Sequence, residues 1–170
     1  MEYIYKGTNI NVTKNRIENS KYDGILTIQT KESWIEYNKI SGTKNGICLN
    51  DSTNIAAYKD IILNSGKGIF LTGTSYSHIN SNYIENNYYG IYLSHSNLNF
   101  IINNILRNNH ECIYHGDNSG GNQIKNNDCG GIGYLMGPIL TIVFICILIT
   151  TITIFIIHII RRRLNNPVSL

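Results

Sequence analysis

The sequence has little net charge with which to attract a charged partner. Residues 1–134 carry eleven Lys/Arg and eleven Asp/Glu side chains, so this region is formally neutral. The excess of +3 comes from three consecutive arginines, Arg161–Arg163. A protein that binds a nucleic-acid backbone needs a basic face. We therefore expect no nucleic-acid partner.

Cysteines are few, and they lack the spacing of a metal site or of a disulfide framework. The chain has no CxxC pair and no Cys/His combination with zinc-site spacing. Of its four cysteines, one lies in an apolar C-terminal run and the other three occupy different positions of the repeat described below: Cys146, and Cys48, Cys112 and Cys129. We therefore expect free thiols, buried or half-buried, and no cofactor.

The N-terminus also lacks an export signal. The first residues, MEYIYKGTNINVTKN, contain neither a basic stretch nor an apolar run of about 7–15 residues. The repeat is under way by residues 10–17 without the capping unit that a solenoid normally has. A misassigned start, a fragment of a longer surface protein and a tail-anchored protein with residues 1–134 in the cytoplasm all explain this. We favour an ectodomain whose N-terminal part is missing.

One long run without formal charge is present, from Pro138 to Ile160. At about 1.5 Å per residue, a helix of this length spans roughly 35 Å, enough to cross a hydrocarbon core of about 30 Å. We predict a single transmembrane helix over residues 137–160. The arginines that follow place the tail, residues 161–170, in the cytoplasm and residues 1–134 outside the cell membrane.

A Gly-Ile dipeptide recurs every 22 residues and defines the architecture. Such a period is typical of a solenoid of stacked units. Each unit holds short strands with apolar residues at alternate positions, which predicts inward columns of aliphatic side chains. The dipeptides begin at Gly24, Gly46, Gly68 and Gly90, and Cys112-Ile113 continues the count. The predicted columns are Ile25, Ile47, Ile69, Ile91 and Ile113; Leu49, Leu71 and Leu93; Ile35, Ala57, Ile79 and Ile101; and Ile40, Ile62, Ile84 and Leu106.

Asparagines follow the same period, and we interpret them as structural. A side-chain amide can donate to one coil and accept from the next, as in a ladder. Asparagine also tolerates the left-handed conformation of a sharp turn, and the glycines are expected to allow the same tight corner. The two predicted ladders are Asn38, Asn82, Asn104 and Asn126, with Asp60 in the gap, and Asn64, Asn86 and Asn108.

The pattern N-x-I…N…G-I-x-L at 22 residues per coil resembles the right-handed parallel β-helix of the pectate-lyase-like superfamily. Its carbohydrate-binding and sugar-hydrolase subgroup, which includes NosD-like periplasmic proteins, is the most similar. The resemblance covers residues 10–133 and implies an all-β solenoid of five to six coils over residues 1–134. Leucine-rich repeats share the period, but their LxxLxL text and helical segment are missing.

The resemblance also implies enzymes that act on acidic polysaccharides, through clustered aspartates or through calcium-binding carboxylates with a basic residue. Asp51 and Asp117 share a phase but lie three coils apart, about 14 Å at ~4.8 Å per coil, which is too far for a catalytic pair. No Asp-Asp or Asn-Thr-Asp motif occurs. We predict a non-catalytic module, with a fragment of a lyase or hydrolase as the alternative.

Two surface features are candidate sites. The residues Leu26, Cys48, Phe70, Tyr92 and Tyr114 share one outward phase, and the aromatic members Phe70, Tyr92 and Tyr114 could stack against sugar rings or contact another surface protein. The alternative is that these aromatics are half-buried beneath turn side chains.

The second candidate follows from the link between NosD-like relatives and copper-site maturation. His95 and Asp117 are 22 residues apart, and His115 lies two residues before Asp117, so all three could reach one ion. The alternative is an ordinary surface turn, because no methionine or cysteine lies nearby to favour copper.

Two further matches concern the cell surface. Asn11-Val-Thr and Asn50-Asp-Ser fit the N-glycosylation acceptor pattern, which suits an external domain. Together these observations predict a membrane-anchored extracytoplasmic β-helix that binds surface glycans or serves as a scaffold. A NosD-like periplasmic accessory protein for copper is a further alternative.

Overall fold

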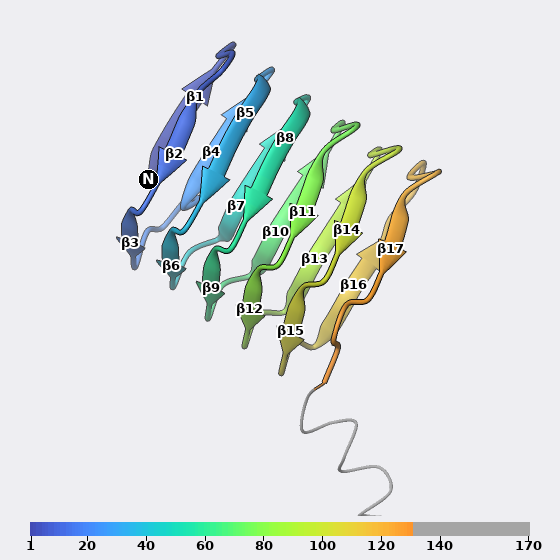
Figure 1. Ribbon diagram of the computed structural model, residues 1–170. Coiled ribbons are helices and arrows are strands. Elements are labelled where there is room, and N and C mark those ends of the chain that lie inside the picture. The colour runs from blue at the N-terminus through green and yellow to red at the C-terminus, as the bar shows by residue number, and fades with distance from the viewer. Residues whose placement is uncertain (131–170) are drawn as a thin grey trace, which may run out of the picture. The chain divides into compact units, whose positions relative to one another are not determined.

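The computed structural model describes residues 1–130, which form a three-sided parallel solenoid (Figure 1). The chain winds through about six coils of about 22 residues, and Met1–Gly131 forms one compact unit. This confirms the predicted all-β solenoid. The predicted transmembrane helix, residues 137–160, and the tail, residues 161–170, lie outside the described residues. Within residues 1–130, no helix is long and apolar enough to cross a membrane.

Three parallel sheets form the sides of the solenoid, and each coil adds one strand to each sheet. Sheet A contains, in spatial order, β1 (Glu2–Tyr5), β4 (Ile25–Ile28), β7 (Asn45–Asn50), β10 (Lys67–Thr72), β13 (Tyr89–Ser94) and β16 (Glu111–His115). Sheet B contains β2 (Asn11–Thr13), β5 (Lys31–Glu36), β8 (Thr53–Tyr58), β11 (His78–Asn80), β14 (Phe100–Ile102) and β17 (Gln123–Lys125). Sheet C contains β3 (Arg16–Glu18), β6 (Lys39–Ser41), β9 (Ile61–Leu63), β12 (Tyr83–Glu85) and β15 (Ile105–Arg107).

Columns of aliphatic side chains fill the interior, as the 22-residue period predicts. Ile47, Ile69 and Ile91 pair in register on β7, β10 and β13, and all three are 0% exposed. The columns on sheets B and C pair in the same way. Full burial of one such side chain contributes about 1.5–3 kcal/mol, so each added coil brings a similar increment of stability.

The glycines of the Gly-Ile dipeptides are required by space and not by backbone freedom. A Cβ on Gly46 would lie 2.3 Å from Ile62 Cγ2 and 2.6 Å from the Gly68 carbonyl oxygen. Their φ angles are not positive, so the predicted reason for these glycines is wrong. Positive φ angles occur instead at corner residues such as Asn64, Asn86 and Asn108, with φ of 51°, 57° and 50°.

A ladder of buried amides joins consecutive coils between sheets B and C. The backbone N–H and Nδ2 of Asn82 both donate to Asn104 Oδ1, each at 3.0 Å, and Nδ2 also donates to the Ala57 carbonyl at 3.0 Å. Asn38 donates to Asp60 Oδ1 in the same way. We call the set the Asn38 row: Asn38, Asp60, Asn82, Asn104 and Asn127.

The other predicted members of the two ladders lie elsewhere. Asn127, not Asn126, accepts from Asn104, because one extra residue between β16 and β17 changes the coil spacing from 22 to 23. Between sheets C and A, the residues that bond from coil to coil are one position beyond Asn64, Asn86 and Asn108: Ser65, Asn87 and Asn109. The structure therefore uses one asparagine for the turn and its neighbour for the ladder.

The last coil contains a disulfide between Cys112 and Cys129, so the expectation of free thiols is wrong for these two residues. The extra residue brings Cys129 one coil beyond Leu106, whose Cδ2 would lie 2.8 Å from a Cβ on Gly90. Cys112 follows Gly90 by one coil, so the disulfide takes the place of the aliphatic–glycine contact of the earlier coils. A count at a fixed period of 22 puts Cys129 in the wrong phase. Cys48 is free and buried.

Candidate functional site

The predicted outward residues of sheet A form one row across five strands. Leu26, Cys48, Phe70, Tyr92 and Tyr114 pair successively in register, and Tyr3 on β1 precedes Leu26. Their side chains point away from the interior because Ile and Leu residues on either side of them point inward. The structure therefore brings the three predicted ligand-binding aromatics together.

Aromatic rings on three adjacent coils pack against one another on this face. The Tyr92 and Tyr114 rings stack, with centroids 4.7 Å apart and planes at 28°, and Phe70 meets Tyr92 edge-on at 5.3 Å. Tyr89 contacts Tyr92 at 4.9 Å and Tyr114 at 5.3 Å. We call these four residues, all half-buried, the sheet A cluster: Phe70, Tyr89, Tyr92 and Tyr114. Each such ring pair adds about 0.5–1.5 kcal/mol beyond burial, so the cluster is pre-ordered.

Sequence reasoning missed Tyr89 and two residues at the rim. Tyr88, 53% exposed, packs against Tyr89 at 4.7 Å and against His110 at 4.5 Å. A signal for this contact was available, because Tyr88 and His110 are one 22-residue period apart. Tyr89 pairs in register with Lys67, and this outward position just before the Gly-Ile dipeptide was not considered.

A lysine ammonium lies over the sheet A cluster. Lys67 Nζ is 4.8 Å from the centroid of the Phe70 ring and 5.1 Å from that of Tyr92. The ring faces attract the cation electrostatically, by about 0.5–1 kcal/mol at an exposed site. Any ligand that covers the face of Phe70 must therefore displace this ammonium or contact it.

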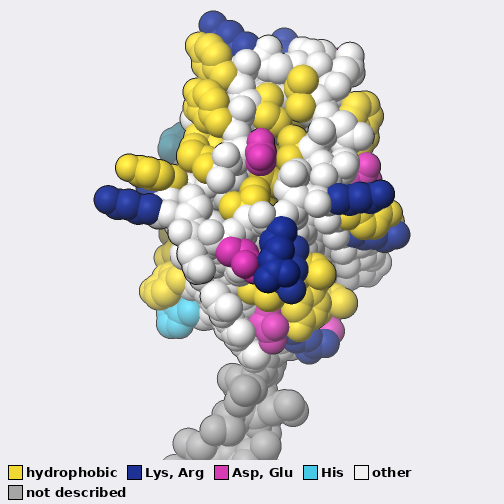
Figure 2. Space-filling view, turned by 90° about the vertical axis from the view of Figure 1, so that its left-hand side faces the viewer, with side chains coloured by type: hydrophobic (Ala, Val, Ile, Leu, Met, Phe, Trp, Pro, Cys, Tyr) yellow, Lys and Arg dark blue, Asp and Glu magenta, His cyan; other side chains and the backbone are white. Residues whose placement is uncertain are grey.

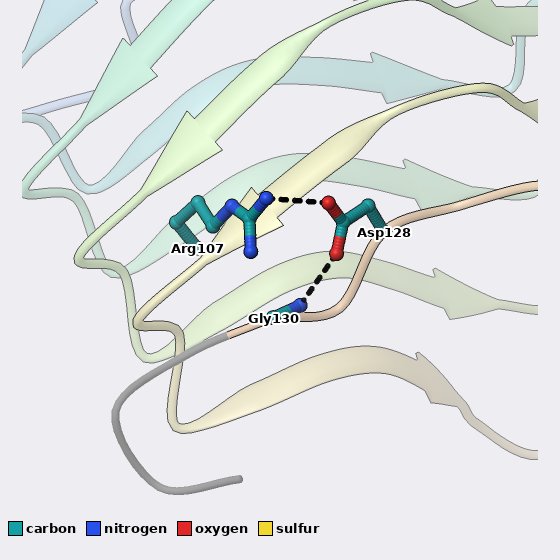
Figure 3. A network of polar contacts seen from close by, with 3 residues as sticks. All are labelled: Arg107, Asp128 and Gly130. Carbon is teal, nitrogen blue, oxygen red and sulfur yellow. Dashed lines mark hydrogen bonds and ion pairs between the residues drawn. The ribbon is translucent and has the colours of Figure 1, made fainter. Parts of the chain in front are cut away.

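Charge is scattered over the surface. On the face that Figure 2 shows, Lys/Arg and Asp/Glu side chains are dispersed among hydrophobic and uncharged ones, without an extended patch of one sign. Two ion pairs occur within residues 1–130, Arg16–Glu18 at 2.8 Å and Arg107–Asp128 at 2.5 Å. In Figure 3, Arg107 donates to one oxygen of Asp128 while the other accepts from the Gly130 N–H. Exposed pairs contribute about 0–1 kcal/mol each.

The two titratable groups with large pKa shifts are buried and structural. Burial, assisted by the Asp23 carboxylate, raises the pKa of the Cys48 thiol to about 12, so it stays protonated and is a poor nucleophile or metal ligand. Burial also raises the pKa of Asp60 to about 7, although hydrogen bonds from Asn38 oppose the rise. Asp60 is 0% exposed, so its carboxyl cannot reach a substrate.

The three predicted metal ligands lie near one another along the chain but face different partners. His95 donates its backbone N–H to the Asp117 carbonyl at 3.0 Å, while its Nδ1 lies 3.0 Å from Ser94 Oγ. His115 pairs in register with Leu93, and its Nε2 lies 3.4 Å from Asn122 Nδ2. Within residues 1–130, no three His, Cys, Asp or Glu side chains are placed to hold one metal ion.

The predicted glycosylation acceptors occupy different environments. Asn11 is the first residue of β2 and is exposed, whereas Asn50 ends β7 and is half-buried. An exposed asparagine is the better acceptor, because the modifying enzyme must reach its amide nitrogen.

These features define a parallel β-helix repeat protein with an ordered aromatic cluster on one outer face. A family model described as periplasmic copper-binding protein (NosD) matches residues 1–132. The chain belongs to this right-handed β-helix family, which agrees with an extracytoplasmic β-helix module. Comparison with curated proteins gives no match. No solved structure matches the chain either.

Proposed function

We propose that this protein is a non-catalytic binding module of the extracytoplasmic space that recognises glycans through the sheet A cluster. The observation that carries the proposal is the continuous set of half-exposed rings on β10, β13 and β16, ordered by contacts of 4.7–5.3 Å. The proposal treats these residues as a ligand-binding surface and the polar ladders as support.

The chemistry of tyrosine suits a sugar. A tyrosine combines a large apolar ring, which can pack against the C–H groups of a sugar, with a hydroxyl that donates and accepts hydrogen bonds. It also loses little conformational entropy on binding, particularly where neighbours already order the ring. Because Tyr92 and Tyr114 stack on each other, a ligand meets mainly their edges and hydroxyls. The row advances by one ring per coil, which suits an extended chain of sugars along the solenoid axis.

The proposed compartment has two supports. The family is described as periplasmic. The Cys112–Cys129 disulfide also fits an oxidising compartment, because cytosolic thiols are normally kept reduced. In this proposal, residues 137–160 anchor the module in the cell membrane and residues 161–170 form a cytoplasmic tail.

Binding is favoured over catalysis by the state of the carboxyl groups. An acid with a pKa near 7 is a typical catalytic candidate, and Asp60 has such a pKa. Its carboxyl, however, is enclosed in the Asn38 row, where Oδ1 accepts two hydrogen bonds from Asn38. Asp60 is therefore better explained as a structural residue than as a general acid.

Copper handling is the second candidate, and the family description is the observation that favours it. The donor set in residues 1–130 does not fit a resident copper ion. Its one methionine is Met1, Cys48 stays protonated and the other two cysteines form a disulfide. Soft copper sites use thiolate, thioether and imidazole ligands that converge on one point. We therefore rank copper handling below glycan binding.

The test measures retention of the full chain on a panel of immobilised polysaccharides, in a polyoxyethylene detergent that carries no sugar. New reducing or unsaturated ends are scored in the same samples. We expect retention without new ends, and loss of retention in Tyr92→Ala/Tyr114→Ala. The matched control is Tyr5→Ala/Tyr22→Ala, which removes two exposed tyrosines outside the sheet A cluster. Equal retention of both double variants, or release of new ends, would contradict the proposal.

A further inference from the structure

A second row of outward side chains, on sheet B, contains a missing ring. Trp34, Ala56, His78 and Phe100 pair successively in register on β5, β8, β11 and β14. Trp34 is 47% exposed, and His78 is exposed as well. The row therefore reads ring, methyl, ring, ring along the solenoid axis.

The stacking of His78 shows which way its free face points. The His78 and Phe100 rings are 4.6 Å apart with planes at 7°, so one face of the imidazole is covered by Phe100. Because the two rings stack along the row, the opposite face is turned toward the coil of Ala56. That coil offers a methyl group where its neighbours carry rings.

The width of this gap selects the kind of ring that fits. Adjacent coils are about 4.8 Å apart, so the positions of Trp34 and His78 are separated by about 9.6 Å. A flat aromatic ring needs about 3.5–4.0 Å on each face and would leave space unfilled. A pyranose in the chair form is thicker because hydrogens project from both faces. The spacing therefore favours a saturated sugar ring over a planar one.

Polar groups lie beside the gap on the same three strands. Glu36, Tyr58 and Asn80 pair in register two residues further along β5, β8 and β11, and all are half-buried. They offer a carboxylate, a phenol and an amide, which between them accept and donate hydrogen bonds. A sugar that presented its C–H faces to the rings would direct its hydroxyls sideways toward such groups.

We propose that Ala56 is the floor of a second glycan-binding site, in which one pyranose lies between Trp34 and His78. The ligand class rests on the proposed function, but the site uses another sheet and none of the residues of the sheet A cluster. Glu36, Tyr58 and Asn80 receive the sugar hydroxyls.

The experiment uses Trp34 as its own reporter, because this is the only tryptophan in the chain. The full chain is titrated with cellohexaose and with chitohexaose, and tryptophan emission is followed under selective excitation. We expect a saturable change with at least one of the two. Ala56→Phe supplies the missing ring and is expected to weaken the response about tenfold or more, the scale of losing one or two ring contacts. The matched control, Ala56→Ser, leaves the gap open and is expected to keep the wild-type response.

The outcomes separate this site from the sheet A cluster. A Trp34 response that persists in Tyr92→Ala/Tyr114→Ala supports a site independent of that cluster, whatever happens to retention on polysaccharide. Polysaccharide retention without any Trp34 response would overturn the second site and leave the proposed function intact. An equal response in Ala56→Phe and Ala56→Ser would also overturn it. Thermal unfolding of both variants checks that they remain folded.

Discussion

Between β7 and β13 the interior is filled by isoleucine and leucine at 0% exposure, whereas on β16 the equivalent Ile113 is only partly buried. The middle coils are stabilised by repetition, since each coil is covered on both sides by another. The last described coil is joined instead by the Cys112–Cys129 disulfide and the Arg107–Asp128 ion pair. A short solenoid can therefore replace hydrophobic cover at its end with covalent and ionic contacts.

The largest expected effect tests this difference directly. Ile69→Ala removes a fully buried side chain from the middle coils and is expected to lower the free energy of unfolding by about 2–5 kcal/mol. Ile113→Ala makes the same change where the side chain is already half-buried, so we expect less than half of that loss. Urea unfolding followed by circular dichroism measures both. Equal losses would mean that the last coil is as well packed as the middle.

The second prediction concerns the one acid in a row of amides. The folded pKa of Asp60, about 7, lies above the model value of 3.8, so the stabilising proton is retained at low pH and lost as the pH rises through about 7. Above pH 8 the buried charge then destabilises the fold by up to about 4 kcal/mol. Asp60 Oδ2, which has no hydrogen-bond partner among the described residues, would become an amide donor in Asp60→Asn.

Asp60→Asn is therefore expected to raise the free energy of unfolding at alkaline pH and to lose this advantage near pH 4. The measurement is a set of urea unfolding curves across that range for both proteins. Asn82→Asp, which puts an acid in the neighbouring position of the same row, should show the opposite change at alkaline pH. A pH-independent difference between Asp60→Asn and the wild type would show that Asp60 is ionised throughout.

The third prediction addresses the disulfide. Cys112→Ser/Cys129→Ser opens a loop of 17 residues, for which the loss of stability is about 3 kcal/mol. Because the bond lies in the last coil, we expect faster amide hydrogen exchange in β15–β17 and unchanged exchange in β7–β10. Protection lost uniformly along the solenoid would show that the coils unfold as one unit and would remove the distinction drawn above.

The smallest effect is expected at the ion pair beside the disulfide. Arg107→Ala removes the contact with Asp128, whose two partners are 40% and 51% exposed, so less than about 1 kcal/mol should be lost. High salt should reduce even that difference. A larger and salt-independent loss would mean that the arginine stem packs over the end of the core.

Particular residues show how far the sequence alone could lead. The isoleucine columns were predictable because a fixed spacing stacks identical side chains, and Ile47, Ile69 and Ile91 do so. Asn127 and Cys129 were not, because one inserted residue changes the phase of everything after β16 and no local pattern marks it. Tyr88 and His110 were within reach of the same count, but they stand outside the Gly-Ile dipeptides on which the reading concentrated.

The sequence by itself determined the solenoid, because a 22-residue period leaves few other ways to bury regularly spaced aliphatic side chains. It also determined which residues point outward, since strand alternation is local. Only the tertiary structure decided which of these outward residues touch: the rings of the sheet A cluster, the stacked pair His78 and Phe100, and the methyl group of Ala56 beside them. Contacts between coils depend on register and on side-chain direction, and both are set by packing across the whole stack.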